Sequence, residues 1–232
     1  MKQQLGSPYK AFLGFFLAIL SLSVAAKEMN NDDPQQLFTD ATRQLILELK
    51  KNSSQIKKNK SIAYNISDRL IVPYLDFQKI TQLVVGKHWR RASNEQKAKL
   101  TEEIRQMLIR SYVTAMTTYA DQIVEQGDNI KYKPSRYKTG DRKATIDTTI
   151  QLLDGKTADV NYKLYNSKQG WKIYDIRVAG ISLTVTYRTS FSAEIKQSGI
   201  DGLIARLEQQ NKSGYVELPE SVKKMNSSAS NN

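Results

Sequence analysis

The sequence predicts an α+β fold in which helices pack on one face of an antiparallel sheet. Three observations support this prediction. Apolar residues recur at the helical period of 3.6 over the first half of the chain, they alternate with a period of two from residue 130 onward, and the helical period returns after Gly180. Helices that precede and follow a block of consecutive strands are typical of α+β proteins.

Residues 1–26 have the layout of a secretory signal peptide. Lys2 and Lys10 lie in a short N-terminal region that precedes an apolar stretch from Ala11 to Val24. Small residues at the end of this stretch allow cleavage near Ala25 or Ala26. The stretch is short for a membrane span, although an uncleaved anchor is the alternative. We therefore expect an exported protein with one folded domain over residues 27–211 and a disordered polar tail over residues 212–232.

The composition excludes several classes of chemistry. The chain of 232 residues has no cysteine, which rules out disulfides, thiol catalysis and a lipidated N-terminal cysteine. The 35 lysines and arginines against 23 acidic residues give a net charge of +12, which favours anionic partners such as acidic lipid surfaces or acidic proteins. We expect no nucleic-acid partner, because the chain combines an export signal with no RNA-binding signature or zinc-finger spacing. A basic surface that serves only solubility remains the alternative.

The first predicted helix begins at Asp33 as N-cap, with Pro34 at N1 and Gln36 at N3 to complete a capping box. Its apolar stripe repeats every four residues: Leu37, Ala41, Leu45 and Leu49. The polar run 51–60 is expected to be the helix end and a connection. A short helix over 62–70 must end before Pro73. Another over 77–85 is closed by Gly86.

The longest predicted helix begins after Ser93, with Gln96 at N3, and ends near Gly127. Its apolar face mixes aliphatic residues, methionine and tyrosine: Leu100, Ile104, Met107, Leu108, Tyr112, Ala115, Met116, Tyr119 and Ile123.

Four strands follow, over 130–137, 143–152, 157–165 and 171–178, and short turns between them predict an antiparallel meander. Asp154-Gly155 is a strong hairpin signal, and a second turn is expected at 167–170. A helix then resumes after Gly180 and breaks at Gly199, and a last helix spans 200–211.

Enzyme motifs are missing from the sequence. His88 is the only histidine, and its basic neighbours favour a partly exposed residue beside a helix rather than a catalytic base or metal ligand. No nucleophile elbow or phosphate-binding loop occurs. We expect neither catalysis nor a cofactor.

Three blocks of the sequence resemble a known family: VVGKHWRRASNEQKAKL (84–100), YDIRVAGISL (174–183) and SGIDGLIARL (198–207). They are similar in order and spacing to the periplasmic phospholipid-binding component C of the Mla lipid-transport system, also called the toluene-tolerance auxiliary family. The likeness extends from about Phe38 to Asn211. It implies a cone related to nuclear transport factor 2: a curved four-stranded antiparallel sheet wrapped by helices around a deep apolar cavity.

The resemblance also implies a function. The protein would be a soluble periplasmic carrier that shuttles phospholipid between an outer-membrane lipoprotein–porin complex and an inner-membrane ABC-transporter complex with its substrate-binding ring. This transport would maintain the lipid asymmetry of the outer membrane. Phospholipid would be the cargo, with the acyl chains inside the cavity, and Lys87, Arg90 or Arg91 could meet its phosphate at the rim.

We expect the cargo to contact apolar residues that the helix and strand periods place on the inner faces of these elements. They are Leu70, Val72, Val84, Trp89, Ile104, Met107, Leu108, Tyr112, Ala115, Ile146, Ile150, Val160, Tyr162, Leu164, Tyr174, Ile176, Val178, Leu183 and Tyr187.

Two alternatives stay open from the residues. By periodicity alone these side chains fill an ordinary closed core. The same cone also hosts isomerases and dehydratases that use a Tyr and an Asp deep in the cavity. Tyr112 and Asp175 could be that pair, although alternation along the strand should turn Asp175 out of the cavity.

Overall fold

The computed structural model describes residues 32–118, 120–151 and 157–214. They form six α-helices, five strands and three short 3₁₀-helices. In chain order these are α1 (Pro34–Ile56), α2 (Lys60–Leu70), η1 (Val72–Tyr74), α3 (Phe77–Val85), η2 (Gly86–Arg90), α4 (Asn94–Thr118), α5 (Ala120–Gln126), η3 (Gly127–Asn129), β1 (Lys131–Tyr132), β2 (Lys143–Gln151), β3 (Thr157–Ser167), β4 (Gly170–Val178), β5 (Ile181–Ser182) and α6 (Leu183–Ser213).

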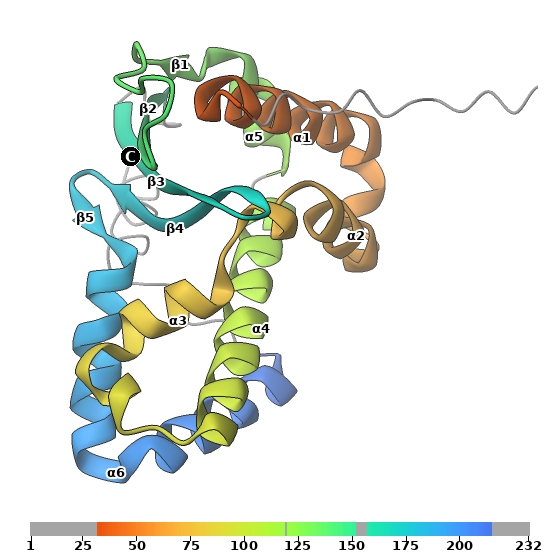
Figure 1. Cartoon of the computed structure of the whole chain (residues 1–232). Helices are drawn as coiled ribbons and strands as arrows, with labels where there is room; N and C mark the ends of the chain where they lie inside the picture. The colour runs from red at the N-terminus through yellow and green to blue at the C-terminus, as the bar shows by residue number, and fades with distance from the viewer. Residues whose placement is uncertain (1–31, 119, 152–156, 215–232) are drawn as a thin grey trace, which may run out of the picture.

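The strands form one antiparallel sheet in the order β1-β2-β3-β4-β5, which confirms the predicted meander and the α+β class. The long pair β2–β3 runs in register from Lys143 opposite Tyr165 to Gln151 opposite Thr157. The predicted Asp154-Gly155 turn lies outside the described residues. The sheet lies beside α1 and α5 at one end of the molecule, and α3, α4 and α6 form the other end (Figure 1).

The prediction of four strands was wrong at both edges of the sheet. The first predicted strand shrinks to β1, because Pro134 has no backbone N–H to donate to β2; the last backbone bond runs from Lys133 N to Asp147 O at 2.9 Å. At the other edge, Ala179 and Gly180 both have positive φ, 48° and 81°, which suits a tight hairpin turn. The turn returns the chain as β5, whose Ile181 pairs with Val178.

The helix starts follow from local hydrogen bonds. The Asp33 carboxylate accepts from the backbone N–H groups of Gln35 and Gln36, so the predicted cap is confirmed. The Gln36 side chain donates to Asp40 instead of reaching back, so that capping box is only half formed. At α4 the box is complete: Gln96 N donates to Ser93 Oγ (3.1 Å) and Ser93 N to Gln96 Oε1 (3.0 Å).

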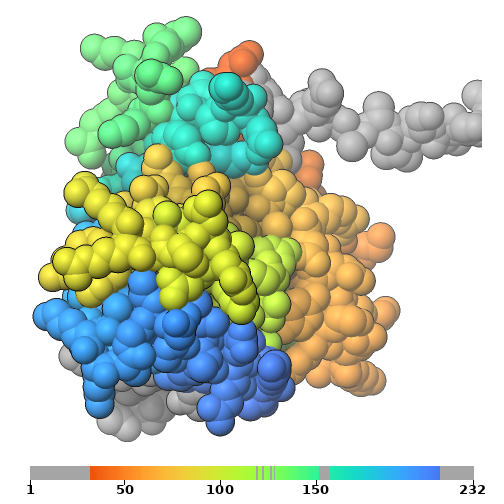
Figure 2. Space-filling view, turned by 60° about the horizontal axis from the view of Figure 1, so that its bottom comes forward, coloured from red at the N-terminus to blue at the C-terminus, as the bar shows by residue number. Residues whose placement is uncertain are grey.

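The core consists of three groups of buried residues. One joins α3, α4 and α6 around Leu100 and Leu203. In Figure 2, α6 (blue) packs beside the segment that contains α3 and η2 (yellow). A second group joins α1, α2 and α4 around Leu49 and Val113. The third packs the start of α1 on the sheet around Trp171.

The last two predicted helices are one element in the structure, α6, which bends at Gly199 (φ 74°, ψ 178°). Lys212 and Ser213, which we had placed in the tail, still belong to α6. The predicted signal peptide and the rest of the tail lie outside the described residues. None of the described helices has the length and apolar character of a membrane span.

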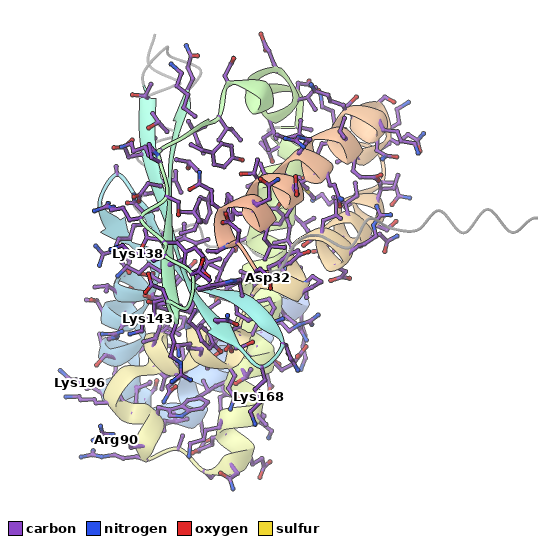
Figure 3. The ribbon with its side chains drawn as sticks, turned by 45° about the horizontal axis from the view of Figure 1, so that its top comes forward. Asp32, Arg90, Lys138, Lys143, Lys168 and Lys196 are labelled. Carbon is purple, nitrogen blue, oxygen red and sulfur yellow. The ribbon has the colours of Figure 1, made fainter. Side chains whose placement is uncertain are left out.

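The predicted exposure of His88 was wrong. Its side chain is only 8 % exposed, and Nε2 lies 3.0 Å from Ser192 Oγ, because η2 folds this residue against α6. Its basic neighbours Lys87, Arg90 and Arg91 are exposed. Figure 3 shows Arg90 and four more exposed cations, Lys138, Lys143, Lys168 and Lys196, projecting from the ribbon.

Candidate binding cavity

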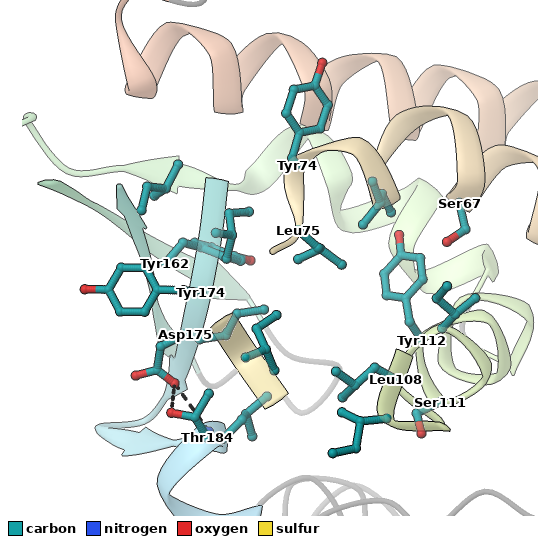
Figure 4. Close-up of a pocket in the computed structure, with 18 of the residues that line it drawn as sticks. Ser67, Tyr74, Leu75, Leu108, Ser111, Tyr112, Tyr162, Tyr174, Asp175 and Thr184 are labelled. Atoms are coloured by element: carbon teal, nitrogen blue, oxygen red, sulfur yellow. Dashed lines mark hydrogen bonds between the residues drawn. The ribbon is translucent and has the colours of Figure 1, made fainter. Parts of the chain in front are cut away.

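An apolar cavity of about 420 Å³ lies between the sheet and the helices. Its wall comes from α1, α2, α3, α4, α6, the segment around η1, and strands β3 and β4. Figure 4 shows the two sides: Leu108 and Tyr112 extend from α4 toward the space, and Tyr162 extends from β3. The wall therefore joins segments that are far apart in the sequence.

Small side chains help to keep the space open. Ala41 and Thr42 lie on the inner face of α1, Ser67 on α2, and Ser111 and Ala115 on α4. A larger apolar residue at these positions would fill part of the cavity, and the interior would then be closely packed as in most proteins. The structure therefore contradicts the closed core that periodicity alone favours.

Most of the residues that we expected to meet cargo belong to the wall. They are Leu70, Val84, Ile104, Met107, Leu108, Tyr112, Ala115, Tyr162, Leu164, Tyr174, Ile176, Leu183 and Tyr187.

The structure places the other expected residues outside the wall. Val72 in η1 packs on the α1–α2–α4 group, and Trp89 in η2 packs on the α3–α4–α6 group. Ile146 belongs to the group under α1. The last three, Ile150, Val160 and Val178, lie near the end of the sheet at which β2 ends and β3 begins.

A β-bulge decides which residues of β4 face inward. Lys163 pairs with Asp175 but Leu164 pairs with Ile173, so Tyr174 is the extra residue. Trp171 and Ile173 therefore face inward before the bulge and Ile176 after it. The Tyr174 ring points away from the cavity centre (Figure 4) and packs edge-on against Tyr165 at 6.0 Å. Tyr174 therefore contributes to the wall without its ring entering the cavity, and strict alternation is wrong for Trp171 and Ile173, which it turns outward.

Sequence reasoning missed several wall residues. The α1 stripe of Leu37, Ala41 and Leu45 was recognised as apolar, yet nothing in the pattern showed that it faces a space. Trp171 and Ile173 were missed because a bulge leaves no mark in the alternation. Phe38, Ile71, Leu75, Ile80, Ile109 and Phe191 are further wall residues outside our expectation.

Asp175 contributes to the wall, which corrects the expectation that alternation removes it from the cavity. Its carboxylate, 6 % exposed, is turned toward Thr184 (Figure 4). It accepts from Ser182 Oγ and Thr184 Oγ1, each at 2.8 Å, and from the Thr184 backbone N–H at 3.3 Å. These bonds tie β4 to the first turn of α6, and they leave the carboxylate engaged in structure.

The inner tyrosines are in an apolar setting. Burial raises the pKa of Tyr162 to about 12 and raises that of Tyr112 even further, so both hydroxyls stay protonated at neutral pH. No group of three or more His, Cys, Asp or Glu side chains that could hold a metal ion occurs in the described part of the chain. Exposed Lys87, Arg90 and Arg91 in and after η2 are not part of the wall.

The fold and the cavity together define a protein with an internal site suited to an apolar ligand. Among the described residues of the wall, the ionisable side chains are tyrosines and the engaged Asp175, and most of the others are aliphatic or aromatic. Such a space suits hydrocarbon better than a polar substrate.

The chain belongs to the MlaC protein family, whose model matches residues 39–209. It is 26% identical over 193 residues to the toluene tolerance protein ttg2D of Pseudomonas putida, covering 83% of this chain and 84% of that one. It is 24% identical over 180 residues to the intermembrane phospholipid transport system binding protein MlaC of Haemophilus influenzae, covering 76% and 81%.

A solved structure supports the same relationship. The phospholipid-binding protein from Ralstonia solanacearum, determined in complex with a phospholipid, superposes with a TM-score of 0.65 at 28% identity. The match covers 78% of this chain and 98% of that one.

Proposed function

We propose that this protein is a periplasmic phospholipid carrier that takes acyl chains into its apolar cavity. The observation that carries the proposal is the apolar cavity between α4 and the sheet, found in a chain whose structural relative was solved with a phospholipid. In this proposal the curved sheet and its helices form a cone related to nuclear transport factor 2, with the cavity inside it.

Physical chemistry explains why such a carrier needs an enclosed cavity. Each methylene group that moves from a bilayer into water costs about 0.8 kcal/mol. A lipid with ~30 methylenes would therefore meet a barrier on the order of 20 kcal/mol without protection. An open groove would leave much of that surface in water. Walls on several sides offset most of the cost, as the wall residues from five helices and two strands would do here.

Proteins of the MlaC family are periplasmic, and the basic N-terminus followed by an apolar stretch supports export of this chain. As partners we propose the outer-membrane lipoprotein–porin complex and the inner-membrane ABC-transporter complex with its substrate-binding ring. The relative from Haemophilus influenzae, which bears the name of the intermembrane phospholipid transport system, supports this assignment.

The surface charge fits anionic partners of this kind. Arg90, Lys138, Lys143, Lys168 and Lys196 are exposed (Figure 3) and make no ion pair with any residue in the described ranges. Unpaired surface cations are free to meet acidic groups on a protein or membrane.

The geometry does not favour the isomerase or dehydratase alternative. That chemistry needs Tyr112 and Asp175 to act on one substrate, but the Asp175 carboxylate is bound by Ser182 and Thr184. The MlaC family is also a family of lipid-binding carriers rather than enzymes.

Native mass spectrometry of the protein purified from cells without detergent tests the proposal. We expect masses that exceed the chain by one or more phospholipids and that return to the chain mass under denaturing conditions. Protein that leaves the cells free of lipid, while folded by circular dichroism, would contradict it.

A further inference from the structure

Among the wall hydroxyl groups that make no hydrogen bond to a described residue, those of Ser67 and Tyr112 lie on adjoining walls. Ser67 lies on α2 and is 1 % exposed, and Tyr112 lies on α4 on the adjoining wall. In Figure 4 their hydroxyls turn toward one another across a gap. Neither side chain makes a hydrogen bond to any residue within 32–118, 120–151 or 157–214.

Several other polar groups of the wall differ in this respect. Ser111 Oγ donates to the Met107 carbonyl at 2.8 Å, and Thr184 Oγ1 donates to Asp175. The Tyr162 hydroxyl has Thr148 as its partner. Ser67 and Tyr112 therefore form a polar spot in an apolar wall, whereas these neighbours are satisfied within the protein.

An unsatisfied hydroxyl in such a place has an energetic cost. Both hydroxyl oxygens are open to the cavity, since neither is a fully buried atom without a partner. Hydrocarbon tails that fill the cavity would bury them, and a buried polar group without a hydrogen bond costs about 1–3 kcal/mol. Because the Tyr112 hydroxyl stays protonated, it is a donor that lacks an acceptor. A ligand that brings an acceptor to this spot would recover that cost.

We propose that Ser67 and Tyr112 bind an ester carbonyl oxygen of the cargo, so that the cavity prefers ester-linked to ether-linked phospholipids. The inference rests on the proposed function. Hydrocarbon tails have no acceptor, and the ester carbonyl is the acceptor nearest to them in a diacyl phospholipid. An ether-linked lipid has the same tails and headgroup without that carbonyl, so the spot would stay unsatisfied when it binds.

A competition experiment tests the proposal. Delipidated protein is mixed with equal amounts of ester-linked diacyl and ether-linked dialkyl phosphatidylethanolamine of equal chain length, and native mass spectrometry gives the ratio bound. We expect the wild type to favour the ester lipid by about threefold to tenfold, the range of one net hydrogen bond. Tyr112→Phe and Ser67→Ala should move the ratio toward one.

Tyr64→Phe is the matched control, because it removes the same hydroxyl group from a residue of α2 that is not part of the cavity wall. It should keep the wild-type ratio. Melting curves establish that each variant is folded. If Tyr112→Phe does not fold, the lipid ratio bound by Ser67→Ala, which is the smaller change, tests the proposal.

Two results would overturn the inference. Equal binding of both lipids by the wild type would show that water or the hydroxyls themselves fill the gap, and the carrier function would stand. A wild-type preference that survives in both folded variants would place the ester contact elsewhere. Failure to bind either lipid would instead contradict the proposed function, and the inference would fall with it.

Discussion

Leu108 on α4 is a single residue on which the binding of hydrocarbon can be tested. It extends into the cavity (Figure 4), while Leu47 on α1 is 58 % exposed to solvent. A carboxylate in contact with acyl chains would lose its hydration without gaining a partner, which costs several kcal/mol.

We therefore expect Leu108→Glu to remove bound phospholipid almost entirely, measured as lipid phosphorus per mole of purified protein. Leu47→Glu makes the same chemical change on the surface and should leave the lipid content unchanged. A folded Leu108→Glu variant with wild-type lipid content would exclude Leu108 from the binding site.

His88 gives a prediction about pH. Burial against α6 is the main cause that lowers its pKa, and the nearby charges of Lys87, Arg91 and Lys196 lower it further. The unfolded chain therefore takes up the proton first, at a pKa of about 6.5. Stability from the neutral His88 is present above that pH and is lost as the pH falls below it.

We expect the free energy of unfolding, measured with urea, to fall by up to about 1.4 kcal/mol per pH unit through this group below pH 6.5. His88→Gln, which keeps a donor near Ser192, should show a correspondingly weaker pH dependence between pH 7.5 and 5. Parallel curves for the two proteins would show that folding does not lower the pKa of His88.

At the scale of the elements, the bend of α6 depends on Gly199. Its φ of 74° and ψ of 178° belong to a region that is open almost only to glycine. No atom lies within 4 Å of the place where a Cβ would stand, so a substitution would act through the backbone alone.

We expect Gly199→Ala to lower the free energy of unfolding by about 1–3 kcal/mol in urea titrations. Ser190→Ala, on the exposed side of the same helix, should change it by less than about 0.5 kcal/mol. An unchanged stability of Gly199→Ala would mean that α6 can straighten without cost.

The helices were the most predictable elements because their signals are local. The capping residues Asp33 and Ser93 determine where α1 and α4 begin, and α3 has the predicted bounds. The sheet edges were not predictable in the same way. Ala179 adopts a left-handed conformation that alanine rarely favours, so the β4–β5 turn has no sequence signature.

The bulge at Tyr174 shows the same limit for the site. The position of the bulge depends on the register between β4 and β3. This register is set by contacts between the two strands, so the sequence of β4 alone does not reveal it. Alternation alone therefore missed Trp171 and Ile173, and it did not show that the Tyr174 ring turns away from the cavity centre.

At the scale of the whole molecule, the cavity depends on how the helices are arranged around the sheet. Ile146 and Leu164 are both buried on the inner face of the sheet, yet Leu164 lines the cavity and Ile146 packs under α1. Periodicity identifies buried faces, but only the placement of α1, α4 and α6 around the sheet decides where they leave space. The resemblance to the family predicted the cavity, whereas the residue pattern alone favoured a closed core.

The central claim is that hydrocarbon occupies this space. A crystal structure of the protein purified with its native lipid tests it most directly. We expect long, unbranched density between Leu108 and Tyr112 on α4 and Tyr162 on β3. An interior that holds only water, or lipid density that lies on the outer surface alone, would contradict the account.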